Sequence, residues 1–184
     1  MDRKYINDML NAGPCPGGME ETIIAFASGE LESEEKRMQA LIHILICDSC
    51  RFTYEDYLRM EHDEDNTYDL NIPEISFNIV NDFIVPFTEH TMQSVAVLST
   101  GKLRTVEFNV TSDKLDYKIV TQHTKEGTEL AVECDDDNAK FYLVDSKSYK
   151  TSFPYSGRAS FAGLKTGKYI LSKNMKHFVF IDIK

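Results

Sequence analysis

The chain of 184 residues has no tryptophan, only five prolines and nine glycines, and no long uninterrupted run of apolar residues. A membrane-spanning helix needs about 20 consecutive, mainly apolar residues, and no stretch of this sequence comes close to that length. Residues 1–13 carry two aspartates and contain no apolar segment, which argues against a secretory signal. We therefore expect a cytoplasmic protein that does not associate with a membrane.

Basic residues are scarce in the first half of the chain. Residues 1–90 contain 19 acidic and 6 basic side chains, a net charge of −13, whereas residues 91–184 contain 11 and 14, a net charge of +3. Together these give the −10 of the whole chain. An acidic surface repels nucleic acid and favours a basic protein partner. We expect no direct contact with nucleic acid, and the opposite signs predict two units with different roles.

Cysteines are also few, but three of the four lie within the first 50 residues. In a cytosolic chain, clustered cysteines are more often metal ligands or redox groups than parts of a disulfide scaffold. The clustering therefore favours a metal or redox site in the N-terminal region.

Helical signals dominate residues 1–60, which we interpret as one small domain. Apolar positions in residues 19–28 follow a helical period, and Gly29 is a suitable stop. Ser33 can cap a second helix that extends to about Ile46, with two glutamates in the first turn where the helix dipole favours them. A third helix is expected after Cys47 and Asp48, so the sequence predicts a three-helix bundle.

Residues 61–72 are polar and acidic, and we interpret them as a linker. Pro73 can occupy the first turn of a fourth helix, and the apolar residues of 73–87 fit the stripe of an amphipathic helix. A helix isolated by a linker needs something to cover its apolar face. We therefore predict that the stripe binds a partner through Ile75, Ile79, Val80, Phe83 and Ile84.

Strand signals replace helical ones from about residue 91. Short segments rich in valine, isoleucine, tyrosine and phenylalanine alternate with turn signals. These segments are residues 94–99, 102–110, 114–122, 128–134, 139–145, 158–164, 168–172 and 177–183. The pattern predicts an antiparallel β-sandwich over residues 91–184. The fold class we expect is therefore α+β, with a helical domain followed by a β domain.

The sequence His43-Ile-Leu-Ile-Cys47-Asp-Ser-Cys50 has the spacing H-x3-C-x2-C. Residues four apart share one face of a helix, so His43 and Cys47 can bind the same ion, and Cys50 can approach from the start of the next helix. A structural zinc site needs four tetrahedral ligands. Cys15, in a loop of prolines and glycines, is the candidate for the fourth, which predicts one structural Zn²⁺.

Other interpretations of these residues stay open. A single cysteine is more often a small buried hydrophobe than a ligand, and a neighbouring Cys–His pair can also form a nucleophile. In a third interpretation, oxidation of the thiolates Cys15, Cys47 and Cys50 would expel the zinc, making the domain a redox sensor.

The run from Cys15 to Met60 resembles the zinc-binding anti-sigma family. It contains Gly29-Glu30-Leu31 between two helices, an acidic helix start, and the H-x3-C-x2-C signature. The resemblance implies three helices held by zinc and a fourth, loosely attached helix, for which residues 73–87 are in the right place. It also implies an anti-sigma factor that binds an extracytoplasmic-function-type sigma factor and blocks its access to RNA polymerase. Unlike many members of that family, this sequence shows no membrane helix.

The segment from Ser156 to Leu171 resembles the closing motif of prealbumin-like and carboxypeptidase-regulatory-like β-sandwiches, with glycines beside Tyr169 and Leu171. This resemblance implies a fold and no activity. The histidines of this half are scattered and form no catalytic set, so we do not expect an enzyme. The alternative is a β-sandwich that binds a small ligand beside a structural zinc domain.

Overall fold

The computed structural model describes residues 15, 17–62, 72–86, 105–112, 115–136 and 138–184. The chain divides into two compact units, Met1–Ile72 and Pro73–Lys184. We call them the helical unit and the β unit and describe each by itself.

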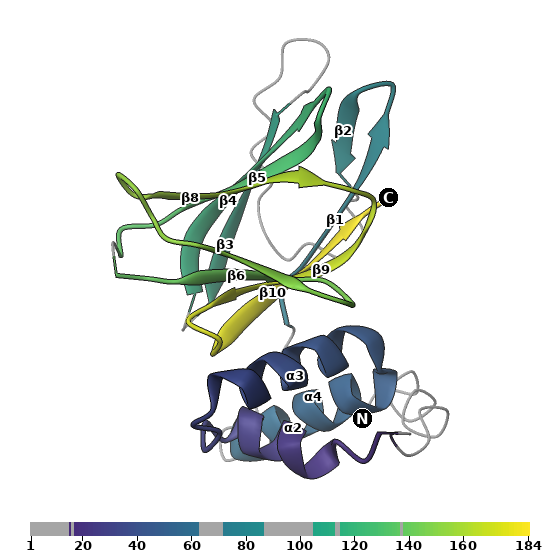
Figure 1. Ribbon diagram of the computed structural model, residues 1–184, viewed down its shortest axis with the longest axis vertical. Helices are drawn as coiled ribbons and strands as arrows, with labels where there is room; N and C mark the ends of the chain where they lie inside the picture. Colours follow the sequence, from purple (N-terminus) through teal and green to yellow (C-terminus); the bar gives the residue numbers. More distant parts are fainter. Residues whose placement is uncertain (1–14, 16, 63–71, 87–104, 113–114, 137) are drawn as a thin grey trace. The chain divides into compact units, whose positions relative to one another are not determined.

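The helical unit contains three described helices: α2 (Glu20–Ala27), α3 (Glu34–Ile46) and α4 (Asp48–His62) (Figure 1). Their apolar faces meet in a small core, in which the rings of Phe26 and Tyr54 lie 5.8 Å apart. The other buried apolar residues of the helices are Ile23, Met38, Ala40, Leu41 and Ile44. The three helices predicted from periodicity are confirmed.

The connection between α2 and α3 follows from two local signals in the sequence. Gly29 has a φ of +77°, a left-handed conformation that glycine adopts without strain, and its N–H donates to the Phe26 carbonyl. The Ser33 hydroxyl accepts a hydrogen bond from the N–H of Lys36 at 3.4 Å and caps α3. Both predicted helix boundaries are therefore in place.

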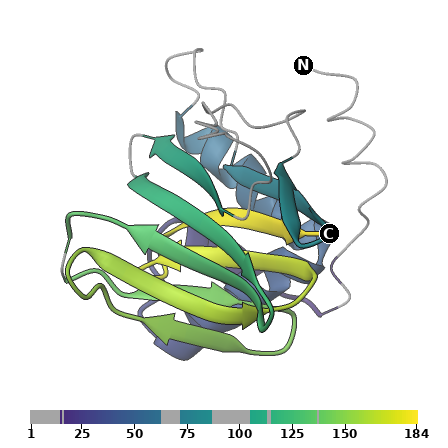
Figure 2. The same ribbon diagram turned by 90° about the horizontal axis from the view of Figure 1, so that it is seen from above.

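The β unit consists of two sheets (Figures 1 and 2). The six-stranded sheet has the order β2-β1-β10-β9-β6-β7, and the four-stranded sheet has the order β3-β4-β5-β8. Neighbours are antiparallel except β1 and β10, which are parallel. The bounds are β1 Glu74–Val80, β2 Phe83–Pro86, β3 Thr105–Ser112, β4 Leu115–Thr124, β5 Gly127–Glu133, β6 Phe141–Val144, β7 Tyr149–Ser152, β8 Arg158–Leu164, β9 Gly167–Lys173 and β10 His177–Ile183.

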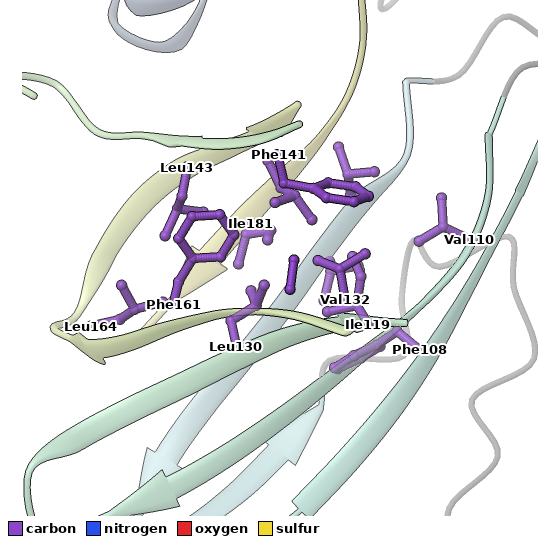
Figure 3. Close-up of a cluster of buried hydrophobic side chains, with 14 of the residues drawn as sticks. Phe108, Val110, Ile119, Leu130, Val132, Phe141, Leu143, Phe161, Leu164 and Ile181 are labelled. Carbon is purple, nitrogen blue, oxygen red and sulfur yellow. The ribbon is translucent and has the colours of Figure 1, made fainter. Parts of the chain in front are cut away.

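One hydrophobic core is built from both sheets of the β unit. Phe141 and Ile181 of the six-stranded sheet lie in the same cluster as Leu130 and Phe161 of the four-stranded sheet (Figure 3). The ring of Phe77 on β1 stacks against Phe108 on β3, with the ring centroids 6.1 Å apart. The two sheets therefore bury their apolar side chains against each other.

The helix predicted over residues 73–87 is wrong: this segment forms β1 and β2, which pair as a hairpin. Its two-residue loop is Asn81-Asp82, and both residues have positive φ values of 50° and 64°. A two-residue loop with positive φ at both positions is the connection that best matches the twist of paired strands. Alternate residues of β1, Ile75 and Phe77, are buried, as expected for a strand with one face on the core.

The same correction removes the reason for a partner-binding stripe on this segment. Ile75 and Ile84 are 3% and 1% exposed in the core of the β unit, and Ile79 packs against that core. Phe83 is half-buried, and Val80 is exposed. The β unit itself covers most of the apolar surface for which we expected a partner.

Most of the predicted strands coincide with observed ones, from β3 through β6 and from β8 through β10. The segment 94–99 lies outside the described residues, as does most of the predicted linker over 61–72. β7 was not predicted. The β unit begins at Pro73, earlier than the residue 91 that the change of period indicated.

Candidate metal centre

The four predicted ligands come together in the helical unit. One ligand atom from each of Cys15, His43, Cys47 and Cys50 lies within 4.8 Å of every other. Cys15 and Cys50 are buried, and His43 and Cys47 are half-buried. These residues are positioned to bind one metal ion.

The spacing H-x3-C-x2-C places three ligands around the corner between α3 and α4. His43 is in the last turn of α3, and Cys47 follows the helix in an extended conformation, with its N–H donating to the His43 carbonyl at 2.8 Å. The helix α4 begins at Asp48, so Cys50 lies in its first turn. The break in the helix at Cys47 lets the second cysteine approach from a different direction.

The fourth ligand is held by a turn before α2. The Cys15 carbonyl accepts from the N–H of Gly18 at 3.1 Å, and the Cys15 N–H donates to the carboxylate of Glu20 at 2.8 Å. Gly18 has a φ of +60°, a conformation that glycine adopts without strain and that few other residues tolerate. Hydrogen bonds thus fix the loop on both sides of the cysteine.

Two of the separations among the ligand atoms are compatible with a tetrahedral zinc site. The Nδ1 atom of His43 lies 3.4 Å from the Sγ of Cys50 and 3.8 Å from the Sγ of Cys15. Zn–S bonds of about 2.3 Å and Zn–N bonds of about 2.0–2.1 Å at a tetrahedral angle place sulfur and nitrogen about 3.6 Å apart. The observed distances lie on either side of this value.

The thiols differ in how readily they ionise. Burial raises the pKa of Cys15, but hydrogen bonds from the backbone of Met19 and Gly17 and from the neighbouring thiols outweigh it, so this pKa lies below its ordinary value. Burial and the thiols of Cys15 and Cys47 raise the pKa of Cys50 well above its ordinary value. The cluster therefore stabilises one thiolate and resists further negative charge, a repulsion that a bound cation would remove.

Such a cluster is suited to holding a metal ion as part of the fold. In structural zinc sites the protein supplies all four ligands, whereas a catalytic site keeps one position open for water or substrate. The convergence of two more thiols on the His43–Cys47 pair favours this role over a two-residue nucleophile.

Two contributors to the site were missed by the sequence analysis, Gly17 and Glu20. Glu20 is the first residue of α2, and its carboxylate also accepts a hydrogen bond from the Cys15 N–H. The pair Gly17-Gly18 beside a candidate ligand was the available signal, because glycines permit tight turns around a metal.

The fourth cysteine and the histidines of the β unit join no second cluster in the ranges that the structure describes. Cys134 is buried directly after β5. Nδ1 of His123 is 3.2 Å from the hydroxyl of Thr128, and its Nε2 is 3.9 Å from the carboxylate of Asp82. Of the helices described, none is long and apolar enough to cross a membrane.

The chain matches no protein-family model, and no curated protein or solved structure is significantly similar to it. The interpretation of the metal centre therefore depends on its own geometry and spacing.

Proposed function

We propose that the helical unit is a zinc-binding anti-sigma domain, which binds an extracytoplasmic-function-type sigma factor and blocks its access to RNA polymerase. The observation that carries this proposal is the convergence of Cys15, His43, Cys47 and Cys50 within a three-helix unit. A loop cysteine before the first described helix, followed by H-x3-C-x2-C at the corner between α3 and α4, is the arrangement that the family resemblance implies.

The ligand set supports zinc as the metal. Three sulfurs and one imidazole nitrogen suit a borderline-soft ion, and Zn²⁺ accepts tetrahedral geometry without electronic penalty. Calcium and magnesium prefer oxygen ligands, of which this cluster offers none.

The charge of the helical unit supports a basic protein partner. Residues 1–72 contain 16 acidic and 6 basic side chains, whereas residues 73–184 contain 14 of each. The whole net charge of −10 therefore belongs to the helical unit. Such a surface attracts basic protein surfaces and repels the phosphates of nucleic acid.

Exposed apolar side chains on all three described helices support the same conclusion. Ile24 on α2, Ile46 at the end of α3 and Met60 on α4 are 42%, 55% and 70% exposed. Exposed large apolar residues can act as the anchors of a protein-binding surface, in which a few such residues supply most of the affinity.

The proposal is tested by binding to a sigma factor encoded next to this protein in the genome. We expect the purified proteins to form a stable complex, and we expect the complex to inhibit transcription by that sigma factor in vitro. The double change Ile24→Asp and Met60→Asp should weaken binding by well over tenfold, because an apolar anchor typically contributes about 2 kcal/mol or more.

Val85→Asp is the matched control, because Val85 is 46% exposed on β2 of the other unit. This control should bind like the unmodified protein, and both variants should retain their metal. Absence of binding to any sigma factor, with the metal bound, would exclude the anti-sigma function and leave the metal centre intact.

We also propose that the two sheets of the β unit form a β-sandwich, as the sequence predicts. The support for this proposal is the single core between two sheets and the glycine turns of the segment that resembles such folds, where Gly157 and Gly163 have φ values of 75° and 68°.

A further inference from the structure

Gly17 lies against the imidazole ring of His43. A Cβ atom added at Gly17 would be 3.2 Å from both Cε1 and Nε2 of that ring, closer than an ordinary van der Waals contact. The ring of His43 would therefore have to shift by a few tenths of an ångström if residue 17 had a side chain.

Position 17 needs a glycine because a side chain would lack space, and not because of the backbone conformation. Gly18 and Gly29 have φ values of +60° and +77°, and a Cβ at either would meet nothing within 4 Å. At Gly17 the φ lies outside the left-handed region, but an added Cβ would meet the ring of the candidate ligand His43.

A different atom of the same ring, the nitrogen Nδ1, lies near the thiols. Nδ1 of His43 is the nitrogen that lies 3.4 Å and 3.8 Å from the sulfurs of Cys50 and Cys15, whereas Nε2 lies on the side of Gly17. An imidazole can bind a metal through either nitrogen, and the ring orientation decides which one is used.

We propose that Gly17 is a positioning residue for the metal centre, which seats the His43 ring so that it binds the metal through Nδ1 and keeps the proton on Nε2. This inference rests on the proposed metal centre and is independent of any sigma factor. The loop before α2 then has two roles: it supplies the Cys15 ligand, and its contact with the His43 ring fixes the orientation of that ring.

The nitrogen that binds the metal can be identified directly in the unmodified protein. We would load the full chain with ¹¹³Cd²⁺, label histidine with ¹⁵N, and record long-range ¹H–¹⁵N spectra. The expected result is a cadmium coupling to Nδ1 of His43, with the proton on Nε2. A coupling to Nε2 would overturn the inference and leave the metal centre standing, whereas absence of bound metal would overturn both.

The role of Gly17 is tested by Gly17→Ala, with Gly18→Asn as the matched control. Asparagine tolerates a positive φ, and position 18 has open space, so the control perturbs the same loop without touching His43. We expect Gly17→Ala to weaken zinc binding by about 10- to 100-fold in a chelator competition, as changes beside metal ligands typically do. The control should stay within about threefold.

Circular dichroism at saturating zinc would show whether both variants reach the helical content of the unmodified protein. Equal zinc affinity of Gly17→Ala and the unmodified protein would overturn the positioning role. An equal loss in both variants would also overturn it, because the effect would then belong to the loop and not to the contact with His43.

Discussion

The two units of this protein are stabilised in different ways. The β unit has a single cluster of 20 buried hydrophobic residues contributed by both of its sheets. The described part of the helical unit has nine buried residues of this kind, and two of them, Cys15 and Cys50, are candidate metal ligands. The described part of the first unit therefore buries far fewer apolar residues than the core of the second.

This difference indicates what each unit needs in order to fold. Domains with small cores bury too little apolar surface to offset the loss of chain entropy, and they commonly rely on metals or disulfides. The ligand cluster of the helical unit is positioned to meet that need. We therefore expect the helical unit to depend on a metal for folding and the β unit to fold without one.

The largest effect is expected when the helical unit can no longer bind its metal. Metal analysis of protein purified under reducing conditions should give about one zinc per chain. Cys47→Ser should abolish zinc binding and unfold the helical unit, because zinc contributes about 10–16 kcal/mol in small zinc-dependent domains. The change is measured by metal content and by NMR spectra, in which the signals of the β unit should persist.

Cys134→Ser is the control for that experiment, because Cys134 is the one cysteine outside the ligand cluster. It should leave the zinc content unchanged. A helical unit that stays folded in Cys47→Ser without metal would contradict the proposed dependence on zinc.

The next largest effect is expected from a cavity in the β unit. Phe77 is fully buried on β1, and Phe77→Ala should lower the free energy of unfolding of the β unit by about 3–5 kcal/mol. Urea denaturation would measure this, and the zinc content should not change. Val80→Ala, on the exposed part of the same strand, should stay within about 0.5 kcal/mol. Similar losses at both positions would show that β1 does not bury one face in the core.

A smaller effect is expected at the start of α3. Ser33→Ala removes the oxygen that accepts from the N–H of Lys36, which should cost about 1 kcal/mol. Only the helical unit should be affected, as a lower midpoint in its thermal unfolding. Ser33→Asp, which retains a capping oxygen, should restore the midpoint, and a failure to do so would mean that the cap contributes nothing.

Local sequence signals were sufficient to predict the three helices of the helical unit and the ligands of the metal centre. A capping serine, a glycine stop and the H-x3-C-x2-C spacing each act within one or two helical turns, so they can be interpreted without knowing the tertiary fold. Cys15 was identified by its residue type, although the hydrogen bonds that hold its loop could not be predicted. The contact of Gly17 with His43 joins residues far apart in the chain, and no periodicity reveals it.

The segment 73–87 shows where this reasoning failed. Ile75, Ile79 and Phe83 fit a helical period, but Ile75, Phe77 and Ile79 fit the period of a strand equally well. Asn81-Asp82 between two β-branched runs favoured a hairpin. β1 also pairs in parallel with β10, about 100 residues later in the chain, and no local pattern can reveal such a partner.

The position of β10 has a consequence for the order of events during translation. β10 lies between β1 and β9 in the six-stranded sheet, yet it is synthesised about 100 residues after β1. At a ribosomal rate of about 5–20 residues per second, the β1–β2 hairpin waits roughly 5–20 seconds for its neighbour. Over that interval the edge of β1 that pairs with β10 lacks its partner strand, so the risk of misassembly is concentrated in the earliest strand of the sheet.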